Sequence, residues 1–115
     1  MTDIEWADLV IRITIGAVMV SFGLHQITNP KLWQEYLPPW LHKIIMAPVT
    51  FMQMHGLLNL SLGLAFGLSL WPDVMTWVVL AWWVSILPFA FYVKWTIGMR
   101  DAAIIASLVA LIILP

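Results

Sequence analysis

The feature that most constrains this chain is a series of four long apolar stretches, separated by short segments that hold most of its charged residues. A helix crosses the roughly 30 Å of bilayer hydrocarbon with about 20 predominantly apolar residues. The expected spans are residues 6–27, 47–70, 74–92 and 98–115. Hydrophobic residues make up 63% of the chain and charged residues 10%, whereas soluble domains have roughly 45–50% and 25%. Because a soluble chain of this size could not bury so much apolar surface, the sequence predicts a membrane protein.

Each span is expected to be helical, because lipid offers no hydrogen-bond partners to the backbone and four strands cannot close a barrel. The predicted fold is therefore an all-α membrane protein: a four-transmembrane-helix antiparallel bundle. It forms a single domain over residues 1–115, with a short interfacial helix over about residues 30–37 between the first two spans.

That interfacial helix lies in the one long polar segment, "LHQITNPKLWQEYLPPWLHK", residues 24–43. Asn29-Pro30 is a favourable helix start, since Asn caps helices and Pro is tolerated at the first helical position. Between this start and Pro38, four apolar side chains share one face. They are Leu32, Trp33, Tyr36 and Leu37. The segment is predicted to be either an anchor in the headgroup region or a lid over a site between the first two spans.

The basic residues predict an orientation. Lys31, Lys43, Lys94 and Arg100 fall at the ends that the first and third connections join, and only Arg12 falls near the opposite end. Cytoplasmic loops carry the excess of Lys and Arg. We therefore expect a multi-pass protein of the cell membrane with both termini outside the cytoplasm.

Small residues predict where the helices pack, because helices in lipid associate through close backbone approach. Gly16 and Gly23 share a face of the first helix, and Gly56, Gly63 and Gly67 share a face of the second. The fourth helix is expected to contribute small residues as well: Ala103, Ala106, Ser107 and Ala110. These patterns predict close contact between the first two transmembrane helices.

Polar residues inside the spans are the candidate functional residues, since such groups are unfavourable in lipid. His55, with Asn59 one turn later and Gln53 nearby, could bond a quinone carbonyl, ligate a metal-centred macrocycle or relay protons. The alternative is a histidine bonded to a neighbouring helix. Arg12 could contact an anionic headgroup or quinone, or could simply be neutralised by Asp8 four residues earlier.

Two further pairs fall in the last two spans. Arg100-Asp101 is expected in the first turn of the fourth helix, where an Asp complements the helix dipole. Trp82 and Trp83 lie deep in the third helix, and face lipid, a flat ligand or a partner helix.

Several chemistries lack support in the sequence. There is no cysteine, and the net charge is −1 without a basic run, so disulfides, thiolate metal sites and nucleic-acid binding are not expected. No clustered carboxylates predict a permanent metal site. No Ser/His/Asp arrangement or glycine-rich phosphate loop predicts a hydrolase or a nucleotide-binding protein.

Several stretches together resemble the DoxX family of small integral membrane proteins, which includes the DoxD subunit of thiosulfate:quinone oxidoreductase. They are Arg12 followed by Gly16, then "FGLHQITNPKLW", "LPPWL", "GLLNLSLGLAFG" and "RDAAIIASLVAL". Gln26 stands where family members commonly carry Lys. The resemblance implies a four-helix membrane bundle and a link to quinone-coupled redox complexes.

The sequence thus predicts a DoxX-like membrane subunit of a larger redox complex rather than an enzyme acting alone. It would supply lipid or quinone contacts through His55, Asn59, Gln53 and Arg12, and partner subunits would carry the redox centres. Quinone is the candidate cofactor. The expected partners are the lipid bilayer and either other membrane subunits or further copies of the chain. The alternatives are a structural subunit that braces a larger assembly and a small oligomeric transporter.

Overall fold

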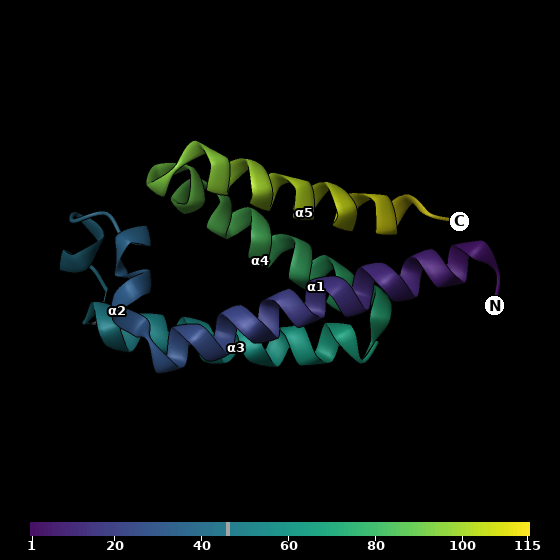
Figure 1. Ribbon diagram of the computed structural model, residues 1–115, viewed down its shortest axis with the longest axis horizontal. Coiled ribbons are helices and arrows are strands. Elements are labelled where there is room, and N and C mark those ends of the chain that lie inside the picture. Colours follow the sequence, from purple (N-terminus) through teal and green to yellow (C-terminus); the bar gives the residue numbers. More distant parts are fainter. Residues whose placement is uncertain (46) are drawn as a thin grey trace.

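Four long helices make up most of the molecule. The computed structural model describes residues 1–45 and 47–115, and within them all regular structure is helical. The long helices are α1 (Asp3–Thr28), α3 (Pro48–Gly67), α4 (Pro72–Val93) and α5 (Trp95–Ile113), and each is long and apolar enough to cross a membrane. They run up and down, so that both termini lie at one end (Figure 1). The predicted fold class is confirmed: a multi-pass helical membrane protein with spans close to those expected.

A short irregular segment connects α1 to α3 at the opposite end of the molecule (Figure 1). It consists of α2 (Pro30–Trp33), the 3₁₀ helix η1 (Gln34–Tyr36) and the 3₁₀ helix η2 (Leu41–Lys43). The predicted interfacial helix is therefore present as one α-helical turn that tightens into a 3₁₀ turn. Asn29 precedes α2 without capping it through its side chain, and its Nδ2 donates to the Thr28 hydroxyl instead (3.0 Å).

Helices α1 and α3 form a tight pair in which the backbones touch. A methyl group added to Gly23 would lie 2.6 Å from the Gly56 carbonyl oxygen, and one added to Gly63 would lie 2.7 Å from Met19 Cβ. Only a hydrogen atom fits at these positions, which is the close approach that glycine stripes provide between helices in lipid. The predicted contact between the first two transmembrane helices is confirmed.

Helices α4 and α5 form a second pair, packed through larger side chains. Gly98 lies directly under the Phe91 ring, and α5 buries Leu108 and Leu111. The prediction that small residues of the last helix pack inward is wrong for three of them, which are exposed: Ala103, Ala106 and Ala110. The face of α5 that packs inward is instead the one with branched side chains, which fill the wider space between these helices.

The apolar core lies where the two pairs cross. All four long helices contribute to it, with the buried side chains Ile15, Met19, Phe66, Val79, Trp83, Leu108 and Leu111. Figure 1 shows the pair of α4 and α5 extending away from the pair of α1 and α3 toward the end that carries α2.

Candidate ligand-binding cavity

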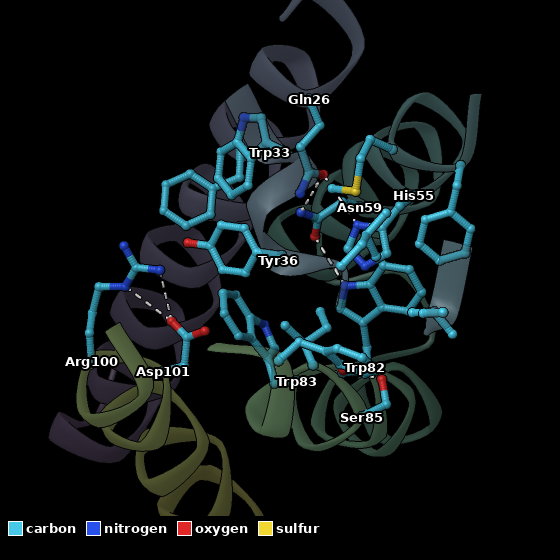
Figure 2. A pocket seen from close by; sticks show the side chains of 17 residues that line it. Gln26, Trp33, Tyr36, His55, Asn59, Trp82, Trp83, Ser85, Arg100 and Asp101 are labelled. Carbon is cyan, nitrogen blue, oxygen red and sulfur yellow. Dashed lines mark hydrogen bonds and ion pairs between the residues drawn. The ribbon is translucent and has the colours of Figure 1, made fainter. Parts of the chain in front are cut away.

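A cavity of about 250 Å³ lies between the two helix pairs at the α2 end of the bundle. Figure 2 shows it surrounded by aromatic rings, with polar side chains at two of its corners. The lining residues are Phe22, Gln26, Trp33, Tyr36, Leu37, Leu41, Phe51, Met52, His55, Asn59, Trp82, Trp83, Ser85, Ile86, Phe89, Arg100 and Asp101. A mainly apolar and aromatic chamber with a few placed polar groups is the usual form of a small-molecule site.

The first polar corner is a hydrogen-bonded wall built from three helices. Gln26 of α1 is buried, and its Oε1 accepts from His55 Nδ1 (3.3 Å) and from Asn59 Nδ2 (3.4 Å), both on α3. Trp82 of α4 donates its Nε1–H to Asn59 Oδ1 (3.2 Å). Because the His55 Nδ1 donates to the amide oxygen, the neutral ring keeps Nε2 as a free acceptor.

Stacking adds to this wall. The His55 and Trp82 rings lie 4.6 Å apart between centroids and are inclined by 27°, so they are stacked. Phe51 lies beyond His55, with its ring centroid 6.3 Å away. The wall thus combines flat apolar faces with one hydrogen-bonding edge, which is the combination that a flat ring with polar substituents requires.

The segment between α1 and α3 closes the cavity on the side of α2. The Trp33 indole donates to His25 Nδ1 (2.7 Å) and stacks on the Tyr36 ring, with 5.4 Å between the centroids. Leu37 is buried against the cavity, whereas Leu32 is 65% exposed. Three of the four apolar residues predicted to share a face therefore cover the cavity, which agrees with the lid alternative more closely than with a detached anchor.

The second polar corner lies on α5. The Asp101 side chain is 3% exposed, and its Oδ1 accepts from Arg100 Nε and lies 3.0 Å from Arg100 Nη2. The Arg100 guanidinium is partly exposed and sits 5.2 Å above the Phe22 ring. Burial raises the pKa of the Tyr36 hydroxyl, which faces this corner, and the Arg100 charge partly opposes the rise. Tyr36 therefore remains a neutral hydroxyl at physiological pH.

Asp101 corrects one expectation from the sequence. Because α5 begins at Trp95, Asp101 lies six residues, or about 9 Å, inside the helix rather than in its first turn. Its charge consequently does not complement the end of the helix. It is matched by the neighbouring guanidinium and directed toward the cavity.

Trp83 lies between the core and the cavity. Its side chain is 3% exposed, and within the described part of the chain its indole Nε1 has no hydrogen-bond partner. A buried donor without an acceptor is uncommon in folded proteins and is unfavourable by roughly 1–3 kcal/mol. Among the described residues, the one buried side-chain donor without a hydrogen-bond partner therefore lies beside the cavity.

The four candidate residues from the sequence separate into two groups. His55 and Asn59 line the cavity together, as the spacing of one helical turn predicts. Gln53 faces away from it: the side chain is exposed and donates to the Ile27 carbonyl oxygen (3.3 Å). Arg12 lies near the other end of α1 and takes no part in this cavity.

Arg12 connects α1 to the first turn of α4. Its Nε donates to Asp8 Oδ2 (3.0 Å), its Nη1 donates to the Pro72 carbonyl oxygen (3.2 Å), and its guanidinium lies 5.2 Å over the Phe66 ring. The ion pair with Asp8 is the contact that the neutralisation alternative predicts, and it is made by a buried Arg12.

Two of the polar residues at the cavity, Gln26 and Asp101, were not predicted as site residues. The sequence did mark Gln26 as the position that departs from the DoxX pattern, and Asp101 as half of a charged pair in an apolar segment. Within the described residues, no group of three His, Asp or Glu side chains is placed to hold a metal ion. Comparisons with protein-family models, with curated proteins and with solved structures gave no significant match.

Proposed function

We propose that this chain is an integral membrane subunit that binds a quinone-class ligand, a flat apolar ring bearing oxygen substituents, in the cavity between its two helix pairs. The observation that carries the proposal is the wall formed by His55, Gln26, Asn59 and Trp82 inside an otherwise apolar, aromatic chamber. Stacked rings would hold the flat head of such a ligand, and the wall would hold one of its oxygens.

The position of the cavity supports a ligand that arrives from the bilayer. Most of its lining residues lie on the four helices that are long and apolar enough to cross a membrane, so a molecule with a lipid-soluble tail would reach it between those helices. A cavity of about 250 Å³ is slightly below the roughly 300–1,000 Å³ of typical ligand sites. This size suits a ring whose tail extends outward between the helix pairs.

The role within a larger redox complex rests on the resemblance to the DoxX family. In this proposal, partner subunits carry the redox centres and this chain holds the quinone. The orientation in the cell membrane, with both termini outside, rests on the Lys and Arg residues at the α2 end.

The proposal can be tested by purifying the chain from native membranes in mild detergent and measuring extracted quinone per chain. We expect bound quinone in the wild type and a severalfold loss in His55→Ala, because that variant removes both the stacking face and a donor to Gln26. Gln53→Ala is the matched control: it removes another polar side chain from the same helix, but one that faces away from the cavity. We expect it to retain the wild-type quinone content.

Two results would contradict the proposal. One is a wild-type protein that neither copurifies with quinone nor binds it when added. The other is an equal quinone content in the His55→Ala and Gln53→Ala variants. Unchanged turnover of a copurifying complex after these replacements would instead favour a bracing role for the chain.

A further inference from the structure

The Asp101 carboxylate has one oxygen that the protein does not use. Both contacts from Arg100 go to Oδ1, at 3.0 Å each. Among the described residues no hydrogen bond reaches Oδ2, although the side chain is only 3% exposed. In Figure 2 the two dashed lines from Arg100 end on one carboxylate oxygen, and the other oxygen lies on the side of the cavity.

This oxygen can only accept a hydrogen bond. An ionised carboxylate has no proton to donate, and the Arg100 guanidinium that contacts Oδ1 supplies the matching charge for an ionised Asp101. A carboxylate oxygen that meets only a mainly apolar cavity lacks the donors that water would supply, which is unfavourable, and more so when the oxygen carries charge. The described residues give no hydrogen bond to Oδ2, and an O–H or N–H of a ligand in the cavity would satisfy it.

The oxidised and reduced forms of a quinone differ in whether their oxygens can donate a hydrogen bond. The oxidised ring carries carbonyl oxygens, which are acceptors and would be repelled by a carboxylate oxygen. The reduced ring carries hydroxyl groups, which are donors. The opposite wall does not discriminate in the same way, because the neutral His55 ring and the Asn59 and Gln26 amides include both donors and acceptors.

We propose that Asp101 makes the cavity selective for the reduced, hydroxyl-bearing form of the ligand, with Oδ2 accepting a hydrogen bond from the quinol. This inference rests on the proposed function, which requires only that a quinone-class ring binds. Beyond the proposed function, the inference states that the reduced form binds more tightly than the oxidised form and that Asp101 determines this preference. Arg100 acts as a positioning residue, because it holds Oδ1 and thereby turns Oδ2 toward the cavity.

The test compares the affinities of a decyl-substituted 1,4-benzoquinone and of its quinol, measured without oxygen on the chain in lipid nanodiscs. For the wild type we expect the quinol to bind about tenfold more tightly, since a hydrogen bond to a charged group in a dry site has about this effect. In Asp101→Asn the ratio should fall to near one, because an amide both donates and accepts. His55→Ala should weaken both forms and leave most of the ratio intact.

A second variant covers the case in which Asp101→Asn leaves Arg100 without its partner and the protein does not fold. The double variant Arg100→Gln/Asp101→Asn removes both charges together, which avoids an unpaired one, and it should also show a ratio near one. Equal binding of the two forms by the wild type, or a quinol preference that survives in either variant, would overturn the role of Asp101 and leave the proposed function intact. No binding of either form by the wild type would overturn both.

Discussion

Replacing Gly56 by alanine should damage the helix pair and the cavity together. A methyl group at this position would lie 2.8 Å from the Gly23 carbonyl oxygen and 2.8 Å from Gln26 Cβ. An ordinary contact begins at 3.4 Å, so α1 would have to move by about 0.6 Å along this direction. The neighbour on one side is backbone, which cannot swing away as a flexible side chain would.

The magnitude follows from two opposing effects. Forcing an extra carbon into a closely packed interface is unfavourable by roughly 1–3 kcal/mol, and alanine regains up to about 1 kcal/mol of helix propensity over glycine. We expect Gly56→Ala to lower the free energy of unfolding by about 1–2 kcal/mol. Gln26 would be displaced as well, and its bonds to His55 and Asn59 are already long at 3.3 and 3.4 Å. Ligand affinity should therefore fall in the same variant.

Gly67→Ala is the control for this prediction. A methyl group there would lie 3.7 Å from Gly16 Cα and 3.9 Å from the Arg12 carbonyl oxygen, which are ordinary contacts. The assay is unfolding of both variants in mixed detergent micelles by increasing the fraction of denaturing detergent, followed by circular dichroism. Gly67→Ala should be at least as stable as the wild type. If Gly56→Ala is as stable as Gly67→Ala, the backbone contact between α1 and α3 is not as close as the structure has it.

Four further outcomes are expected. Arg12→Lys should lower the free energy of unfolding by about 1–2 kcal/mol in the same assay, because a single ammonium group cannot reproduce the two directed guanidinium bonds; wild-type stability would contradict this. Ser69→Gly should raise stability by up to about 1 kcal/mol, since Ser69 has a φ of 56° in the left-handed region. Tyr36 has a pKa above its unfolded value, so its contribution to stability is present below pH 10 and declines as pH rises through the raised pKa; a Tyr36→Phe variant should lack that decline in an alkaline unfolding series. In sealed cells, an impermeant amine reagent should leave Lys31 and Lys94 unlabelled until the membrane is opened, and labelling from outside would reverse the proposed orientation.

The spans could be predicted from the sequence because the signal for them is local. Each depends on about 20 consecutive residues and on the thickness of the bilayer. The pairing of α1 with α3 was also readable, since their glycines recur at helical spacing. The packing of α5 was not, because small residues on a helix can face a neighbour or lipid equally well, and the choice depends on the shape of α4.

Two of the four predicted site residues, His55 and Asn59, line the cavity, and the other two do not. Polarity in an apolar span marked His55 first and Asn59, Gln53 and Arg12 with it, but only the three-dimensional arrangement decides which of these side chains face inward. Gln53 and His55 are two residues apart and therefore point in different directions around α3. The position of Asp101 was predicted wrongly because the predicted helix began at residue 98 rather than at Trp95. In the first turn of a helix, an Asp would be explained by its interaction with the helix dipole.

The distribution of buried polar groups also bears on whether the cavity is a site or a packing defect. Among the described residues, the buried polar or charged side chains are Arg12, Gln26, Asn59, Thr76 and Asp101. Two of them, Arg12 and Thr76, donate to the same carbonyl oxygen, that of Pro72 in the first turn of α4. The other three, Gln26, Asn59 and Asp101, all line the cavity at the α2 end. Polar groups inside a membrane protein are unfavourable unless they are paired or used, and a packing defect between two helix pairs would be lined by apolar side chains alone. Three of the five buried polar side chains therefore line one cavity, and the described residues give no hydrogen bond to Asp101 Oδ2. This clustering favours a ligand site over an empty gap.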